Sequence, residues 1–269
     1  MNHTGLPVIG VAVLYEEVFV LREIISEIEV YNAKTLKKQP AVAVPELASP
    51  VGLAASAKCR CLYVLDRGVR RKDGDNFSVH RIDWKNDVRT WPVSGTPVGM
   101  SVPRDGCSVI LTYESEGMLR EYTTHGAILR KIKLLPPDTI RPFSAVQASN
   151  DVFLVSFKNV SEGVHRVCSF EDDGHVVRCY GAGLTNPATL AVKEDRLVLV
   201  TDTFRRSVLL LSPKLVFIRA IASKRVDRNG WTPQILCPDD GRERVFVAEN
   251  QFDYNSETYV RGEVVQIVV

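Results

Sequence analysis

A proline followed by a short apolar run recurs six times along the chain, and this repeat restricts the fold more than any other feature. The successive spacings are 43, 47, 45, 45 and 46 residues, between Pro7, Pro50, Pro97, Pro142, Pro187 and Pro233. A period of this length is typical of supersecondary units that pack side by side. The sequence therefore predicts six similar units.

Each unit continues with further short runs that have the composition of β-strands. A second apolar run follows about ten residues after each proline, as in CLYVLD at 61–66 and LVLVTD at 197–202, and five of the six end in an acid or an amide. A third run follows in every unit and a fourth run in five units. The runs are rich in Val, Ile, Leu and aromatic residues and are bounded by Gly, Pro, Asn and Asp, which favours strands.

Six units of four antiparallel strands predict an all-β, six-bladed β-propeller that forms a single domain over residues 1–269. The stretch 17–31 has some helical pattern, but it lacks a cap and a C-terminal Gly, so we expect two strands there. The sixth unit stops at its third run. We therefore expect a three-stranded last blade, or a chain that belongs to a longer multidomain protein. The expected blades cover approximately residues 7–49, 50–96, 97–141, 142–186, 187–232 and 233–269.

These units resemble the NHL repeat, in which Pro, Gly and an apolar strand precede strands of the "VxD" and "RIxVF" type. The second unit shows this best, with Pro50-Val-Gly-Leu-Ala, Leu62–Asp66 and Val79–Asp83, and the segments Asn186–Ala191, Leu197–Asp202 and Val245–Asn250 follow the pattern. Units one, three and four lack most of the acidic signature. The resemblance implies a binding platform like the C-terminal domain of TRIM-NHL proteins. If the chain is a fragment of a longer protein, the resemblance implies upstream modules such as the zinc-binding and coiled-coil segments of TRIM-NHL proteins, and none of these is present in this sequence.

Composition limits the function classes. The formal net charge is +2, from 34 Lys and Arg against 32 Asp and Glu, so any electrostatic recruitment must be local. No apolar run reaches the roughly 20 residues of a membrane helix, and the start MNHTGLPVIG does not resemble a secretory signal. We expect a cytoplasmic protein with reduced thiols. The triplets at Asn2, Asn76 and Asn159 keep an extracellular location as the alternative.

The innermost runs argue against catalysis. Six-bladed propellers that resemble lactonases hold a metal with carboxylates and amides of their innermost strands and adjoining loops. Here VIGVAV, VGLAAS, VGMSVP, FSAVQA and ATLAVK contain no Asp, Glu, His or Asn, and the sixth run, QILCPD, offers only Gln234 and a terminal Asp239. We therefore expect no enzyme, no cofactor and no metal, and a metal-dependent lactonase-like hydrolase is the disfavoured alternative. Cys168 and Cys179 fall on neighbouring predicted strands, and we expect them to be a reduced pair.

The partner surface is expected on the face where the loops between second and third strands emerge, together with the loops that lead to the next blade. We predict a protein or peptide partner there, or at the aromatic stretch 251–259. A single-stranded RNA is the alternative, with Arg and Lys contacting phosphates and Phe204 and Trp231 stacking on bases. The candidate partner-binding residues are Arg67, Arg70, Arg71, Lys72, Phe204, Arg205, Arg206, Lys224, Arg225, Arg228 and Trp231.

Overall fold

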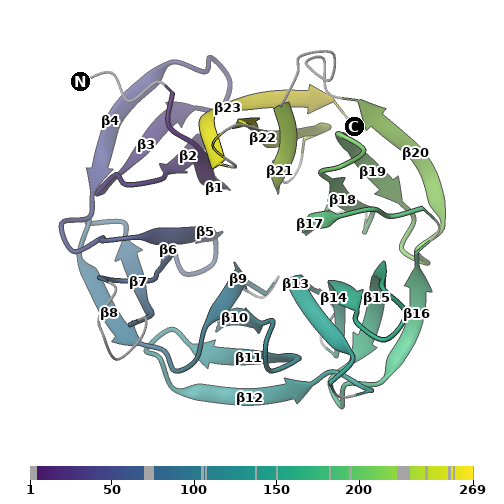
Figure 1. The fold of residues 1–269 in the computed structure, drawn as a ribbon. Coiled ribbons are helices and arrows are strands. Elements are labelled where there is room, and N and C mark those ends of the chain that lie inside the picture. The colour runs from purple at the N-terminus through teal and green to yellow at the C-terminus, as the bar shows by residue number, and fades with distance from the viewer. Residues whose placement is uncertain are drawn as a thin grey trace.

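The chain forms a ring of six antiparallel sheets around a central axis (Figure 1). The computed structural model describes residues 5–69, 76–103, 106, 108–136, 138–149, 151–181, 183–193, 196–222, 231–239, 242–253, 256 and 258–268. Within this part of the chain every regular element is a strand, and five sheets have four strands while the last has three. The predicted all-β, six-bladed propeller with a three-stranded last blade is confirmed. No helix in the described residues is long and apolar enough to cross a membrane.

Each blade runs from the axis outward in chain order. The innermost strands are β1 (Val8–Leu14), β5 (Pro50–Ser56), β9 (Pro97–Ser101), β13 (Ile140–Ser149), β17 (Pro187–Val192) and β21 (Trp231–Pro238). The second strands are β2 (Glu17–Arg22), β6 (Cys61–Asp66), β10 (Ser108–Tyr113), β14 (Val152–Asn159), β18 (Val198–Asp202) and β22 (Arg244–Asp253). The third strands are β3 (Glu27–Asn32), β7 (Ser78–Asp83), β11 (Met118–Thr123), β15 (Val164–Glu171), β19 (Ser207–Leu211) and β23 (Thr258–Val268). The fourth strands are β4 (Lys38–Ala43), β8 (Val88–Pro92), β12 (Ile128–Lys133), β16 (Val176–Tyr180) and β20 (Phe217–Ala222).

The second strands explain the uninterrupted apolar runs of the sequence. Every residue of β6, β10 and β18 is buried, because these strands lie between two strands of their own blade and pack against a neighbouring blade on each face. A strand that is covered on both faces reads as a continuous hydrophobic run. The stretch 17–31, which has some helical pattern, forms β2 and β3 as expected.

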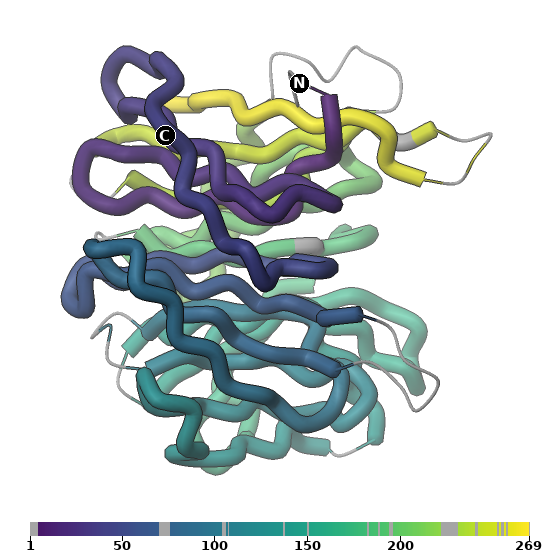
Figure 2. Tube along the Cα trace, turned by 90° about the vertical axis from the view of Figure 1, so that its left-hand side faces the viewer, coloured from purple at the N-terminus to yellow at the C-terminus, as the bar shows by residue number. Residues whose placement is uncertain are grey.

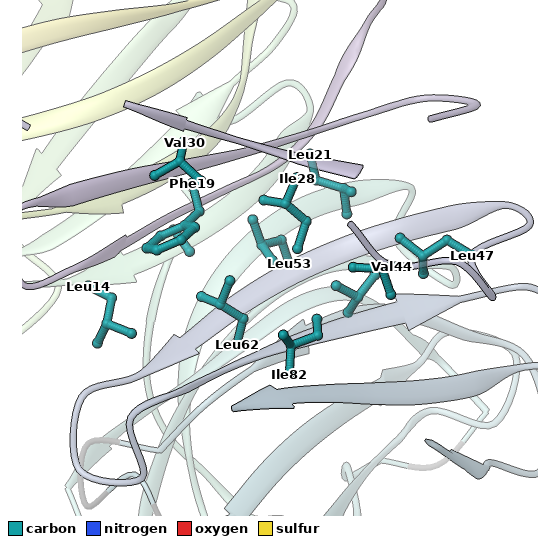
Figure 3. Close-up of a cluster of buried hydrophobic side chains, with 12 residues drawn as sticks. Leu14, Phe19, Leu21, Ile28, Val30, Val44, Leu47, Leu53, Leu62 and Ile82 are labelled. Atoms are coloured by element: carbon teal, nitrogen blue, oxygen red, sulfur yellow. The ribbon is translucent and has the colours of Figure 1, made fainter. Parts of the chain in front are cut away.

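Adjacent blades are held together by apolar clusters between their sheets. Between the first two blades, Leu21 and Ile28 of one sheet meet Leu53, Leu62 and Ile82 of the next (Figure 3). Comparable clusters lie at the other interfaces. Burial of one such side chain contributes roughly 1.5–3 kcal/mol, so the ring of interfaces supplies most of the stabilisation.

The ring is closed by side chains rather than by a shared sheet. Asn250 accepts a hydrogen bond from the backbone N–H of Val8 and donates one to the Val8 carbonyl, both at 2.8 Å. Arg22 donates to the carbonyls of Leu6 and Gly262 at 2.7 and 2.9 Å. Gly262 is required here, because a Cβ at this position would lie 2.4 Å from the Val8 nitrogen. These contacts join the last blade to the first.

The structure corrects one expectation about the cysteines. Cys168 of β15 and Cys179 of β16 are directly opposite each other, with their Cα atoms 4.0 Å apart, and they form a disulfide. The expectation of a reduced pair is therefore wrong at this position. Two neighbouring apolar strands give the same sequence pattern with or without a bond between their sulfurs, so the pattern could not distinguish the two states. Among the other described cysteines, Cys59, Cys61 and Cys237 form no disulfide.

Candidate functional site

The central channel is lined by the innermost strands of all six blades. The cavity has a volume of about 330 Å³, and most of its lining residues are apolar, with Val11, Ala54, Met100, Val146 and Ile235 among them. Its polar side-chain groups are hydroxyls, the amide of Gln147, the ammonium group of Lys58 and the thiol of Cys237, and its described lining residues include no Asp, Glu or His. Elsewhere in the described part of the chain, no group of three or more His, Cys, Asp and Glu is placed to hold a metal ion. The described lining thus offers no carboxylate or imidazole for acid–base chemistry.

One face of the ring carries exposed apolar side chains on its loops. We call the surface formed by the loops between second and third strands the loop face. Ile24, Val69 and Phe204 on this face are 78%, 69% and 77% exposed, and Val160 is also exposed. In the last blade, Tyr259 and Val260 are exposed beside the end of the β22–β23 hairpin, which extends beyond the neighbouring strands (Figure 2). The series covers five consecutive blades around the ring: the fourth, fifth, sixth, first and second.

Fewer blades carry an exposed apolar residue in the loops of the opposite face. In its described loops these residues are Tyr15, Leu36, Trp84 and Val216, of the first, second and fifth blades. At the strand ends beside these loops, Ile128, Val176, Phe217 and Val268 are also exposed. The Tyr15 hydroxyl is also engaged, because it donates to the Ala57 carbonyl at 3.2 Å. Counting the described loop residues alone, the loop face carries exposed apolar side chains in four blades and the opposite face in three.

Buried polar side chains hold the loops of this face in place. Asp202, at the end of β18, accepts hydrogen bonds from the backbone N–H groups of Thr185, Asn186 and Arg205 at 2.9, 3.2 and 3.2 Å. It also accepts one from the Thr185 hydroxyl at 2.6 Å. These bonds fix both the loop that enters the fifth blade and the turn that carries Phe204. The acidic ending of the second strand is therefore a structural anchor for the loop face.

Asp66 has the same role in the second blade. It accepts hydrogen bonds from the backbone N–H groups of Ala48 and Ser49 at 3.1 and 2.7 Å, and it lies 3.6 Å from the ring of His80. Burial alone would raise its pKa, but the His80 side chain and the N–H groups of Ala48, Ser49 and Gly68 outweigh that effect and lower the pKa. The carboxylate is thus stabilised in its ionised form.

This lowered pKa predicts a pH dependence of stability. The folded state holds Asp66 ionised at a pH where the unfolded chain already takes up a proton, so its contribution is complete above pH about 4 and is lost as the pH falls through the folded pKa. We expect Asp66→Asn to be less stable than the wild type at pH 7, with a difference that shrinks below pH about 4. Urea unfolding at a series of pH values measures this, and a difference that stays constant or grows in acid would contradict it.

The structure describes five of the predicted partner-binding residues. Arg67, Phe204 and Arg205 are exposed on the loop face, and Arg206 is half-buried there. Trp231 is only 6% exposed within β21, so it offers no ring face for a base to stack on. The remaining candidates, Arg70, Arg71, Lys72, Lys224, Arg225 and Arg228, lie outside the described residues.

The sequence reasoning missed the apolar residues of the loop face. It selected the basic residues of the same loops and did not consider Ile24, Val69 and Val160. For Ile24 and Val69, the position after the acidic end of the second run was the signal that could have found them. A large apolar residue beyond that end is past the buried part of the strand.

Solved structures of other proteins share the fold of this chain, but the comparisons do not place the chain in a family. No family model matches the chain, and no curated protein matches it either. Among solved structures, a protein of unknown function from Bacteroides caccae is 13% identical, with a TM-score of 0.67 over 94% of this chain and 89% of that one. The PQQ-bound aldose sugar dehydrogenase of Streptomyces coelicolor is 12% identical, with a TM-score of 0.66 over 98% and 96%. A catalytically inactive virginiamycin B lyase from Staphylococcus aureus with quinupristin is 11% identical, with a TM-score of 0.63 over 100% and 97%.

These likenesses define the class of the protein. At such low identity they show the fold alone, and the chain is a six-bladed β-propeller whose structural neighbours include enzymes as well as a protein of unknown function. A shared propeller does not carry a function with it. The function must be argued from this chain's own surfaces.

Proposed function

We propose that this chain is a non-catalytic, NHL-like propeller that binds a protein partner through its loop face. The observation that carries the proposal is the series of exposed apolar side chains, Ile24, Val69, Val160 and Phe204, continued by Tyr259 and Val260. Exposed apolar residues gathered on one face are typical of surfaces that dock onto other proteins. The anchoring of these loops by Asp66 and Asp202 supports the proposal, since preorganised loops lose less conformational entropy on binding.

The lining of the central channel supports the non-catalytic part of the proposal. Its described residues include neither a carboxylate nor an imidazole, whereas general acid–base catalysis and binding of hard metal ions both use such groups. The loop face offers apolar area in place of reactive groups. Binding of a protein partner needs only exposed side chains of this kind.

We expect capture of a protein partner to depend on the loop face. The double variant Ile24→Asp/Phe204→Asp places charges on two apolar loops and should reduce partner capture at least tenfold, because each buried apolar side chain contributes roughly 1.5–3 kcal/mol to an interface. The measurement is quantitative mass spectrometry of proteins cross-linked to the immobilised chain. The matched control Trp84→Asp/Val216→Asp changes the opposite face and should retain the partner. Equal loss in both variants, or retention by the loop-face variant, would contradict the proposal.

Single-stranded RNA is the second candidate, because Phe204 is exposed next to Arg205 and Arg206 on the same turn. A stacked aromatic residue beside phosphate-binding arginines is a common way to hold single strands. If RNA is the ligand, the logarithm of the affinity for a labelled oligonucleotide falls linearly with the logarithm of the salt concentration, and Arg205→Glu/Arg206→Glu lowers both the affinity and the slope. Lys85→Glu/Lys214→Glu on the opposite face is the control. Salt-independent retention would exclude RNA.

A further inference from the structure

The last blade differs from the other five at the outer edge of its third strand. The register of the blades places Ile28, Val79, Leu119, Val167 and Val208 at one equivalent position of their third strands, and each is at most 1% exposed. The equivalent residue of β23 is Val264, which is only half-buried. Within the described residues, the outer edge of β23 pairs with no strand, whereas each of the other third strands is covered by a fourth. Figure 1 shows β23 at the rim between β20 and β4.

In the other five blades, the fourth strand covers this position of the third strand with a large apolar side chain. A large apolar residue always lies directly opposite it, and these residues are Val42, Trp91, Ile132, Tyr180 and Ile221. Each packs into the apolar cluster between its own blade and the next. Two residues earlier, four of the five strands carry an arginine, namely Arg89, Arg130, Arg178 and Arg219. The fourth strands of blades two to five therefore share the pattern Arg-x-(Trp, Ile or Tyr).

A cavity lies where the sixth such residue would be. Its volume is about 230 Å³, and its lining combines the apolar side chains of Val18, Val20, Leu36, Phe246 and Val264 and the ring of Tyr31 with the polar Arg22, Glu263 and Gln266. For comparison, an apolar cavity of about 150 Å³ is large enough to bind benzene. The apolar cluster at this interface includes Val264 but receives no side chain from a fourth strand among the described residues. The cavity therefore has room for one large apolar side chain.

We propose that an extended segment of a partner polypeptide with the pattern Arg-x-(Trp, Ile or Tyr) adds to β23 as the fourth strand of the last blade. It runs antiparallel to β23, with its apolar residue opposite Val264 and inside the cavity, and its arginine opposite Gln266. Backbone hydrogen bonds to the strand edge supply affinity, and the cavity selects the side chain. The site lies on the rim of the ring and is independent of the loop face.

A second copy of this chain fits this site less well. A second copy of β23 would present Arg261-Gly-Glu263, in which the cavity position is a carboxylate rather than a large apolar group. The lining already holds the Glu263 carboxylate, and its cation, Arg22, is paired with Glu29, so a further carboxylate would be desolvated without a partner of its own. The chemistry of the cavity therefore favours a segment with a large apolar side chain over a second copy of β23.

The chain itself supplies the probe for a test. A fluorescent peptide with the sequence of residues 127–134, AILRKIKL, should bind the whole protein, and the same peptide carrying Arg130→Ser and Ile132→Ser should bind at least tenfold more weakly, because it lacks the side chain that fills the cavity. Fluorescence anisotropy measures both affinities. Hydrogen exchange should slow along β23 on binding and stay unchanged along β11. Equal affinities of the two peptides, absence of binding, or protection elsewhere would overturn the proposal.

Two protein variants separate binding from folding. Val264→Asp should abolish peptide binding, and because this change could also unfold the chain, a second variant adds residues 123–134 after Val269, so that the strand is supplied within the same molecule. This extension should raise the melting temperature and prevent the free peptide from binding. The same extension with Arg130→Ser and Ile132→Ser should do neither. A dimer in sedimentation that the peptide dissociates would identify a second copy as the occupant and would overturn the proposal.

Discussion

Replacement of Arg22 by methionine should lower the free energy of unfolding by about 3 kcal/mol or more. Arg22 is 6% exposed, pairs with Glu29 at 2.8 Å, and donates to the carbonyls of Leu6 and Gly262. Methionine fills similar space but removes every one of these bonds. The buried Gly262 carbonyl and the half-buried Leu6 carbonyl then lose a donor, and among the described residues Glu29 keeps only Lys38, at 2.7 Å, as a cationic partner. Each buried group without its partner costs about 1–3 kcal/mol.

The position of Arg22 predicts which strands of the Arg22→Met variant unfold locally first. Since its bonds join the first and last blades, hydrogen exchange should increase first in β1 and β23, before the blades on the far side of the ring. Arg166→Met is the matched control, because Arg166 pairs with Glu162 at the surface, where such pairs contribute about 0–1 kcal/mol. Urea unfolding of the two variants measures the difference. A loss below about 1 kcal/mol for Arg22→Met would mean that the ring closure does not depend on this side chain.

The repeat in the sequence was sufficient to predict the architecture. Each blade faces a similar pair of neighbours, so each strand position has a similar burial in every unit, and the apolar runs recur with the period of the blades. The prediction of strands at 17–31 followed from the same register. What the repeat could not show is how the last blade meets the first. That contact depends on Arg22, Asn250 and Gly262, and Arg22 occupies the position that Asp66 and Asp202 hold in the second and fifth blades.

The site was harder to predict because surface residues do not follow the repeat. Loop residues face solvent, so burial does not determine which residue types occur there. Basic residues are common on such surfaces whether or not they bind a partner. Trp231 shows the limit: it follows a charged loop in the sequence, yet it is buried in β21. The Arg-x-apolar pattern of the fourth strands was present in the sequence, but its meaning needed the register. Only the register places those apolar residues opposite a common position of the third strands.

The second large effect is expected at Asp202. Its side chain is fully buried, and it accepts three backbone hydrogen bonds and one from the Thr185 hydroxyl. Asp202→Ala leaves the N–H groups of Thr185, Asn186 and Arg205, whose hydrogen bonds to Asp202 are part-buried, without this acceptor. Because such groups cost about 1–3 kcal/mol each and part of the cost is relieved by water, we expect a loss of about 3 kcal/mol in the free energy of unfolding. Urea unfolding with tryptophan fluorescence measures it.

The same variant tests whether the loop face is held from within. If Asp202 positions the turn that carries Phe204, then Asp202→Ala should speed hydrogen exchange at residues 203–206 under conditions where the core strand β18 is still protected. Asp173→Ala is the control, because Asp173 is exposed and accepts a bond from the His175 N–H at 2.9 Å, so its loss should cost less than 1 kcal/mol. Faster exchange in the turn without global unfolding would show that a buried carboxylate shapes the exposed surface. Unchanged exchange there would mean that the turn keeps its conformation without Asp202.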